Sequence, residues 1–340
     1  MSLLGAHPTR SLQRARVDVG GPARRPGSSG CHGHVAAVVD SAAELLATAA
    51  PYLEDGLRAG DLTVLSCDRE TTELLRAELG AAGGALVSEP RISLRDTRAP
   101  DAFALVRGLL QQSAHTPTGR MRLLGMPWFG TRPRDWREGA RFEAAANVAM
   151  AGLQLDVVCC YDATTLPAEV VDTAWRTHPQ VLRGGAFSDN PQFERPGRFL
   201  RALPLPRETM EAGPPVYAVD GAPTLADLRH QLAAVLAAQV PDREQREDLH
   251  LAVSEIAANA FRHGVPPVSA RVWASADWIV CTITDSGRGL VDPLAGFQPA
   301  HGDDLSRGGM GLWLARKLWA HVDLLHGRQG FTVRLSSPLR

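Results

Sequence analysis

The sequence contains few of the features that usually give a first indication of function. Lys317 is its only lysine, so 35 of its 36 basic residues are arginine. Because Lys317 stands in Ala-Arg-Lys-Leu, no G-x-x-x-x-G-K-[ST] phosphate loop exists anywhere in the chain. Any nucleotide must therefore be held in another way.

Cysteine is scarce, and the five cysteines include no C-x-x-C pair. Their odd number and spacing argue against a disulfide framework and against a cysteine zinc site. Vicinal Cys159 and Cys160 lie in an apolar run, where we expect core thiols rather than a redox sensor. The run Cys31-His32-Gly33-His34 offers transition-metal ligands, but they are too crowded for a closed tetrahedral set. We expect this run to lead into a strand.

Long apolar runs are also absent. No stretch reaches the roughly 18 apolar residues of a membrane helix, and the N-terminus lacks the apolar run of a secretory signal. We therefore expect a cytoplasmic protein with no membrane partner. The net charge of −1 gives no global electrostatic reason to expect a nucleic-acid partner.

The length of 340 residues fits two domains. Residues 1–31 carry five arginines and one acid among glycine and proline breakers, so we expect a disordered basic tail. A nucleic-acid-binding arm is the alternative, but a charge run is weak evidence for one. We place the domains at 32–200 and 223–340, with a linker at 201–222.

The segment 32–200 alternates short apolar runs with helical patterns. This alternation predicts βαβ units and a mostly parallel sheet, and therefore an α/β domain. No G-x-G-x-x-G fingerprint occurs in it, so the fold class alone indicates no function. The predicted strands are 61–67, 121–125 and 155–161, and the predicted helices are 41–58, 69–79 and 136–153.

The segment 223–340 has a different pattern, with helices and β-like runs grouped rather than alternating. We expect an α+β domain in which helices cover one face of a mixed sheet. The predicted helices are 225–239, 241–263 and 310–320, and the predicted strands are 268–274, 278–284, 321–325 and 331–335.

Three patterns in this second segment have a chemical interpretation. Glu255 and Asn259 are four residues apart on a predicted helix, so both project from one face. A carboxylate there can orient an attacking hydroxyl, and an amide oxygen can ligate Mg²⁺. Such a pair is also common on solvated helix faces, so it is weak evidence alone.

The second pattern is Asp285-Ser-Gly287-Arg-Gly289 directly after a predicted strand. A carboxylate at a strand end can accept a hydrogen bond from an adenine amino group, and the glycines let a base approach the backbone. The third pattern, Arg307-Gly-Gly309-Met-Gly311-Leu312, opens a helix whose exposed amides can face a phosphate. Alone, either pattern is more often an ordinary turn.

The order and spacing of the three patterns resemble the ATP-binding domain shared by histidine kinases, gyrase and Hsp90. The compact form of the motifs is most similar to the anti-sigma regulatory factor serine/threonine kinases. The resemblance implies an α/β-sandwich ATP-binding fold with ATP and Mg as cofactors. It covers about 120 residues, and its motifs are Ser254-Glu-Ile-Ala-Ala-Asn-Ala-Phe-Arg-His-Gly264, Asp285-Ser-Gly-Arg-Gly-Leu290 and Gly308-Gly-Met-Gly-Leu-Trp-Leu314.

Carried over by position, the resemblance implies Glu255 as the catalytic base and Asn259 as the Mg ligand. Asp285 with Gly287 and Gly289 would form the adenine pocket, and Thr332 would lie beneath the base. Leu290–Arg307 would be a mobile lid. The full set of implied ATP-binding residues is Asn259, His263, Asp285, Gly287, Gly289, Gly309, Gly311, Leu312 and Thr332.

The first segment resembles, more loosely, the sensory domain of the dichloromethane regulator and methanogen sensors. The residues that carry the resemblance are His34, Tyr52–Asp61, Cys160-Tyr-Asp162 and Arg176-Thr-His178-Pro179. This domain resembles RecA-like ATPases but lacks their phosphate loop, as this chain does. The resemblance implies that it senses an unknown small signal for a kinase module.

Together these features predict a signal-responsive serine/threonine kinase of the anti-sigma type. Its partner would be an anti-sigma-factor antagonist, a sigma factor, or both, and related kinases raise the question of a homodimer. One alternative is a module that binds ATP and only sequesters a partner, although an inert domain has no chemical need for Glu255. The other is a sensor histidine kinase, for which His230 is the positional candidate although no hairpin surrounds it.

Overall fold

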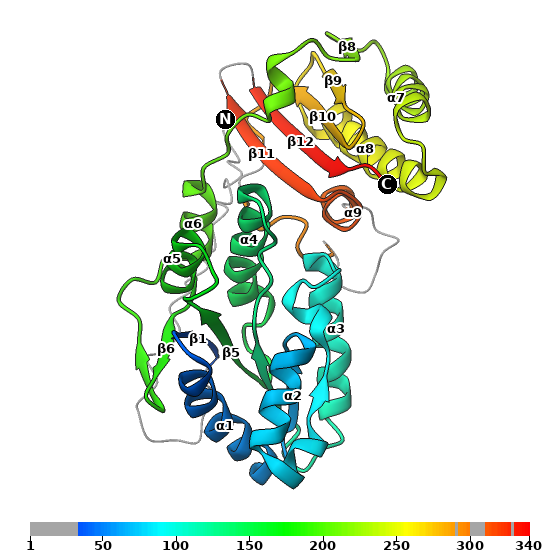
Figure 1. Ribbon diagram of the computed structural model, residues 1–340. Coiled ribbons are helices and arrows are strands. Elements are labelled where there is room, and N and C mark those ends of the chain that lie inside the picture. Colours follow the sequence, from blue (N-terminus) through cyan, green and yellow to red (C-terminus); the bar gives the residue numbers. More distant parts are fainter. Residues whose placement is uncertain (1–32, 290–291, 300–309, 328–329) are drawn as a thin grey trace, which may run out of the picture. The chain divides into compact units, whose positions relative to one another are not determined.

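The computed structural model describes residues 33–289, 292–299, 310–327 and 330–340 (Figure 1). Within this part of the chain, two separate sheets carry two domains. The basic tail expected at residues 1–31 lies outside the described residues. Among the described helices, none combines the length and the apolar composition that a membrane span requires.

The first domain is built on a seven-stranded sheet with the order β3-β2-β4-β5-β1-β6-β7. All neighbouring strands are parallel except β6 and β7, which confirms the expected α/β domain. The strands are β1 (His34–Val39), β2 (Leu62–Ser66), β3 (Val87–Ser88), β4 (Met121–Gly125), β5 (Leu155–Asp162), β6 (Gln180–Arg183) and β7 (Ala186–Asp189). The helices are α1 (Ala42–Ala59), α2 (Arg69–Glu78), α3 (Ala99–Ser113), α4 (Pro133–Ala149), α5 (Ala168–Thr177) and α6 (Pro196–Ala202), with short 3₁₀ turns η1 (Gly80–Ala85) and η2 (Pro90–Ser93).

The turn from β1 to α1 leaves no room for a phosphate loop. Only Asp40 and Ser41 separate the two elements. The Ser41 hydroxyl accepts a hydrogen bond from the amide of Glu44 at 3.2 Å, and the Glu44 carboxylate accepts one from the amide of Asp40 at 2.8 Å. Two carboxylates at the start of α1 would repel a phosphate, so this domain lacks the usual nucleotide site of parallel sheets.

Apolar side chains pack on both faces of the first sheet. Val35 and Val39 of β1 pack with Leu53 of α1 on one face, whereas Ala36 and Val157 pack on the other. A strand buried on both faces has no polar side to alternate with. This explains why its strands appear in the sequence as continuous apolar runs.

The second domain has a five-stranded sheet with the order β11-β12-β10-β9-β8. All its neighbouring strands are antiparallel, so the expectation of a mixed sheet is wrong. The reason is that β12 returns between β10 and β11 and runs antiparallel to both. The strands are β8 (Tyr217–Val219), β9 (Ser269–Ala274), β10 (Trp278–Asp285), β11 (His321–Gly327) and β12 (Gly330–Pro338), and the helices are α7 (Leu225–Gln239), α8 (Arg243–His263) and α9 (Gly311–Leu318).

Helices cover one face of this second sheet (Figure 1). Leu228 of α7, Ile256 of α8 and Trp319 after α9 pack with strand residues such as Val272 and Ile283. Trp319 is fully buried, and its indole Nε1 donates a hydrogen bond to the carbonyl oxygen of Leu249 at 3.2 Å. This layer fixes α8 and α9 against the strands that carry the site described below.

The segment 201–222, which the sequence suggested as a linker, contributes to the second domain. It contains the 3₁₀ turn η3 (Thr209–Ala212) and strand β8, which pairs with β9 at the sheet edge. Trp273 of β9 donates from its indole nitrogen to the carbonyl oxygen of Gly213 at 3.0 Å. The proline-containing segment 201–222 therefore makes specific contacts with the second sheet.

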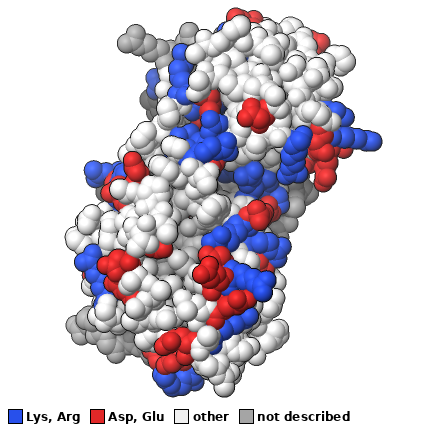
Figure 2. All heavy atoms as spheres, in the orientation of Figure 1, with Lys and Arg blue, Asp and Glu red and all other residues white. Residues whose placement is uncertain are grey.

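Charged side chains of both signs are spread over the visible surface. Figure 2 shows basic and acidic side chains interspersed on one face, without an extended area of a single sign. This distribution matches the nearly neutral net charge of −1.

Candidate functional site

A cavity of about 600 Å³ lies in the second domain beside the end of β10. Apolar residues such as Ile256, Ile283, Phe331 and Val333 line much of it, with a few polar groups among them. An apolar pocket with a small number of placed polar groups is typical of a small-molecule site. Six residues predicted from the sequence line it: Asn259, His263, Asp285, Gly287, Gly289 and Leu312.

Asp285 supplies a held carboxylate at this cavity. It is the last residue of β10 and only 6% exposed. Its Oδ1 accepts hydrogen bonds from the backbone amides of Val265 at 3.1 Å and Gly287 at 2.7 Å. Because these bonds fix the carboxylate through Oδ1, Oδ2 remains as the acceptor for a donor group in the cavity.

Gly289 allows the backbone after β10 to pass directly over an aromatic ring. Its φ is +73°, and a Cβ at this position would lie 2.2 Å from Cδ2 of Phe331. Any larger residue would have to displace that ring or the turn. A glycine here therefore keeps Phe331 as part of the cavity wall, as a flat ligand would require.

The α8 side of the cavity is formed by Asn259, against which the start of α9 packs. A Cβ at Gly311 would lie 2.4 Å from Nδ2 of Asn259 and 3.3 Å from the carbonyl oxygen of Glu255. Gly311 does not itself line the cavity. The glycine that the sequence assigned to phosphates thus has a packing role, since it brings the N-terminus of α9 against Asn259.

Glu255 lies one helical turn before Asn259 but does not line the cavity. Its Oε1 is 3.4 Å from Nη2 of Arg229 on α7, and its side chain is partly exposed. The carboxylate therefore faces α7 and solvent.

Besides Glu255 and Gly311, Thr332 does not line the cavity. Gly309 lies outside the described residues. Thr332 stands between Phe331 and Val333, which both line the cavity. Because strand side chains alternate between faces, Thr332 faces the opposite side, where its hydroxyl lies 2.8 Å from that of Thr284.

The cavity also has a wall that the sequence did not predict. Ala145, Val148 and Ala149 of α4, in the first domain, line it, and so do Leu294 and Phe297 after β10. No local pattern marks these alanines as site residues. In the sequence, Phe297 is the one signal for this wall, because an aromatic residue in a glycine- and proline-containing segment indicates an anchor. The structure buries it.

The segment Leu290–Arg307, predicted to be a mobile lid, is described only at residues 292–299. There Phe297 is 3% exposed and packs in a cluster with Phe103 and Phe142 of the first domain. The Gln298 amide nitrogen donates to the carbonyl oxygen of Ala149 at 3.3 Å. The described part of the segment is therefore docked on α3 and α4. The remaining lid residues lie outside the described residues.

Both domains match known families. Residues 33–179 match the family described as MEDS, the methanogen/methylotroph, DcmR sensory domain. Residues 220–337 match the family described as the histidine kinase-like ATPase domain. The chain joins a MEDS sensory domain to a histidine kinase-like ATPase domain. The cavity therefore lies in the ATPase domain, with one wall from the MEDS domain.

Solved structures similar to the chain include two bacterial signalling proteins. The RsbU and RsbW domains of Rv1364c from Mycobacterium tuberculosis are 22% identical, with a TM-score of 0.24, over 38% of this chain and 34% of that one. The histidine kinase domain of the blue-light-activated kinase from Erythrobacter litoralis EL346 is 21% identical, with a TM-score of 0.23, over 38% and 68%. The chain thus spans about a third of the first of these. No curated protein is significantly similar to it.

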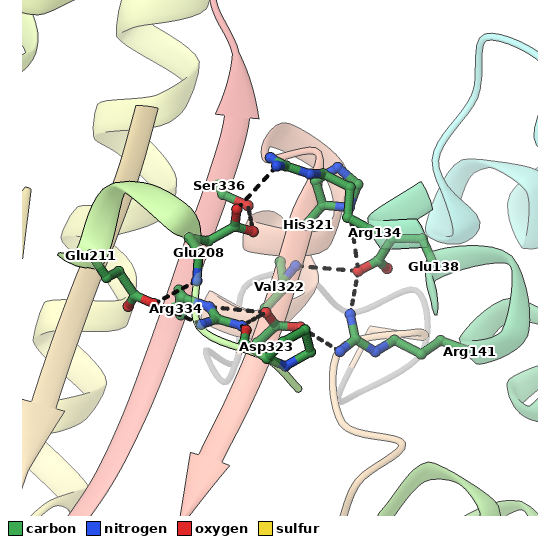
Figure 3. Close-up of polar contacts among 11 residues, drawn as sticks. Arg134, Glu138, Arg141, Glu208, Glu211, His321, Val322, Asp323, Arg334 and Ser336 are labelled. Carbon is green, nitrogen blue, oxygen red and sulfur yellow. Dashed lines mark hydrogen bonds and ion pairs between the residues drawn. The ribbon is translucent and has the colours of Figure 1, made fainter. Parts of the chain in front are cut away.

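A buried ionic network joins the MEDS domain to the ATPase domain (Figure 3). Arg141 of α4 donates to Oδ1 of Asp323 on β11, and Arg334 of β12 donates to Oδ2 of Asp323 at 2.6 and 3.0 Å. Asp323 and Arg334 are each 1% exposed, and Arg141 is 6% exposed. Three charges removed from water are thus held by one another.

Further groups complete this network (Figure 3). Glu138 of α4 accepts hydrogen bonds from Arg141 and from the amide of Val322, and Arg334 also donates to Glu211 at 2.9 Å. Burial alone would raise the pKa of Asp323, but the charges and hydrogen bonds of Arg141 and Arg334 outweigh it and hold that pKa well below its usual range. The carboxylate therefore stays ionised at the domain junction.

Proposed function

We propose that the chain is a cytoplasmic, signal-responsive serine/threonine protein kinase of the anti-sigma type. The carrying observation is the cavity in which the held carboxylate of Asp285, the amide of Asn259 and the Gly289 turn meet. Its substrate would be a serine or threonine on a small anti-sigma-factor antagonist protein. Phosphorylation of that protein would control a sigma factor and hence transcription.

The cavity has the groups that an adenine nucleotide needs. Oδ2 of Asp285 can accept a hydrogen bond from the adenine amino group, and the ring of Phe331 beneath Gly289 can lie against the base. Asn259 offers an amide oxygen as a ligand for Mg²⁺. Mg-ATP held there would supply the γ-phosphoryl group, and its Mg²⁺ would neutralise the charge that develops during transfer.

The protein contributes positioning and one proton acceptor. The start of α9 packs against Asn259 at Gly311, and its backbone amides would face the phosphates of a bound nucleotide. Glu255 takes the proton of the attacking hydroxyl, and Arg229 at 3.4 Å orients its carboxylate. The proposal also includes a homodimer and direct contact with a sigma factor as partners. Each of these would need a protein-binding surface on this chain.

A second candidate is a module that binds ATP and acts by sequestering a partner. The observation that favours it is the position of Glu255, which is paired with Arg229 and does not line the cavity. A carboxylate held outside the cavity would leave nucleotide binding without transfer.

Phosphoryl transfer to candidate antagonist proteins, followed with radiolabelled ATP, tests the proposal. We expect label on serine or threonine that survives acid and is lost in base. Glu255→Gln should abolish transfer and leave ATP binding nearly intact. Label that is acid-labile and base-stable would instead indicate a histidine kinase, for which His230→Gln is the matched variant. ATP binding without transfer to any antagonist would favour the sequestering module.

A further inference from the structure

Four side chains with metal-binding atoms converge inside the MEDS domain. They are His34 at the start of β1, Glu143 on α4, Cys159 on β5 and His178 at the end of α5, and one ligand atom from each lies within 4.8 Å of the others. All four are 6% exposed or less. His34 thus meets residues that are remote in the sequence, and Cys31 and His32 lie outside the described residues.

The hydrogen bonds of His178 show which of its ring nitrogens is free. Nδ1 lies 3.0 Å from the carbonyl oxygen of Ala174, which can only accept, so Nδ1 carries the hydrogen. In a neutral ring Nε2 then presents a lone pair. This Nε2 is buried without a hydrogen-bond partner and lies 3.2 Å from Oε2 of Glu143.

His34 is oriented in the same way by Asn147. The Asn147 amide nitrogen donates to the carbonyl oxygens of Glu143, Ala144 and Thr177, the last at 2.7 Å. Its Oδ1 is therefore the acceptor that faces Nδ1 of His34 at 3.4 Å. Nε2 of His34 is left as a lone pair, 3.2 Å from Oε2 of Glu143 and 3.5 Å from Sγ of Cys159.

Three acceptors consequently face one another in the buried interior of the domain. Neither oxygen of Glu143 has a hydrogen-bond partner, and both Nε2 atoms point a lone pair at its Oε2. Buried acceptors without a donor are costly, and a buried carboxylate without a positive partner more so. A cation among them would remove this cost.

The spacing of the atoms suits a metal ion. Bonds of about 2.0–2.3 Å from Zn²⁺ to nitrogen, oxygen and sulfur put tetrahedral ligand atoms roughly 3.3–3.7 Å apart. Three of the pairs here are 3.2, 3.2 and 3.5 Å apart. Two imidazoles and a thiol favour a transition metal over Mg²⁺ or Ca²⁺, which prefer oxygen ligands.

We propose that His34, Glu143, Cys159 and His178 bind one divalent transition-metal ion, with Zn²⁺ as the best match. Asn147 and the carbonyl group of Ala174 orient the two imidazoles, as outer-shell partners do in known metal sites. The thiol proton of Cys159 leaves when the metal binds, because the thiolate is the ligand. The proposal is independent of the kinase activity proposed above.

The alternative to a metal is a proton on one of the two imidazoles, which would then pair with Glu143. Added metal ion binds to the cluster if it is a metal site and does not bind if a proton already pairs with Glu143. A metal titration therefore separates the two alternatives.

The test is a titration of chelator-treated full-length protein with Co²⁺, followed by its absorption spectrum. We expect the ligand-field and thiolate charge-transfer bands of a four-coordinate Co²⁺ site, saturation at one ion per chain and displacement by Zn²⁺. Cys159→Ser should lose the charge-transfer band. Asn147→Ala should weaken binding by about 10- to 100-fold, the effect typical of outer-shell changes.

Matched variants control for other ligands. Cys160→Ser changes the next residue of the same strand, which packs in the cluster on the opposite face of the sheet, and should leave the bands unchanged. A Cys31→Ser, His32→Asn double variant should also leave them unchanged. If that double variant abolishes the bands, or if Cys160→Ser has the same effect as Cys159→Ser, the assignment is wrong.

A second measurement avoids variants that fail to fold. Thermal unfolding of the unaltered protein should shift to higher temperature with Zn²⁺, because a ligand bound only by the folded state stabilises it. Mg²⁺ at the same concentration should give no such shift. Absence of both the Zn²⁺ shift and the Co²⁺ bands in the unaltered protein would overturn the proposal and leave a protonated imidazole as the account of the cluster.

Discussion

Helix α4 carries two buried charged groups only two residues apart, Arg141 and Glu143, and their surroundings differ completely. Arg141 donates to Glu138 and to Asp323, and Asp323 in turn accepts from Arg334. Glu143 Oε2 lies 3.2 Å from the Nε2 atoms of two imidazoles, and neither oxygen of Glu143 has a partner in hydrogen-bonding geometry. Arg141 has carboxylate partners within the chain, whereas Glu143 has no positively charged partner among the described residues.

This difference separates a structural role from a ligand role. A buried charge network in which each group is paired fixes one arrangement of the two domains and needs nothing further. A buried cluster of acceptors without a donor is stable only if something else enters it. Similar composition and similar burial can therefore have opposite functional meanings.

The largest effect should come from breaking the complete network. Asp323→Ala leaves Arg141 and Arg334 buried without their shared carboxylate, and we expect a loss of about 3–5 kcal/mol in the free energy of unfolding. Chemical denaturation measures it. Arg58→Ala, which removes exposed ion pairs with Glu54 and Asp55, is the control and should change stability by less than about 1 kcal/mol. Equal effects for Asp323→Ala and Arg58→Ala would contradict the distinction.

The same network predicts a pH dependence with a definite sign. The pKa of Asp323 is lowered in the folded protein, so its contribution is fully present above its unfolded-state pKa of about 4 and is lost as the pH falls toward its folded value. The stability difference between the unaltered protein and Asp323→Asn should therefore narrow below about pH 4. Glu138 and Glu211 are present in both proteins and cancel in the comparison. A difference that stays constant down to pH 3 would rule out this origin.

The smallest effect should come from the incomplete cluster. In metal-free protein Glu143→Gln removes a buried charge that has no positive partner, so we expect no decrease in the free energy of unfolding. With Zn²⁺ the unaltered protein should gain stability and the variant should gain much less. Denaturation with and without metal measures both. A loss as large as that of Asp323→Ala in metal-free protein would mean that Glu143 is already paired.

The elements of both domains were largely predictable from the sequence. The runs at 121–125 and 155–161 are strands because a strand buried on both faces is mostly apolar, and Arg122 and Asp156 are their only charged residues. The order of β12 between β10 and β11 was not predictable, because it depends on pairing between distant segments and not on any local pattern.

The candidate site was predictable only where its residues stand in motifs. Asn259, Asp285 and Gly289 line one cavity as the resemblance implied. Thr332 faces the other side of the sheet, since a shift of one residue in a strand reverses the direction of the side chain. The α4 wall was not predictable, because it depends on how the MEDS domain docks on the ATPase domain.

The cluster at Glu143 shows the same limit more strongly. His34 and Cys159 meet because β1 and β5 are neighbouring parallel strands, with Ala36 opposite Cys159. Glu143 and His178 come from two different helices. Spacing in the sequence offered only the crowded run Cys31-His32-Gly33-His34, which we expected to lead into a strand. The fold brings His34 to Cys159, more than a hundred positions away in the sequence.

The most direct test of the central claim is calorimetric titration of the full chain with ATP and Mg²⁺, beside Asp285→Asn and Asn259→Ala. If the cavity is the nucleotide site, the unaltered protein binds one Mg-ATP, Asp285→Asn binds it more weakly with or without Mg²⁺, and Asn259→Ala loses mainly the dependence on Mg²⁺. No binding by the unaltered protein, or equal binding by all three, would contradict the account.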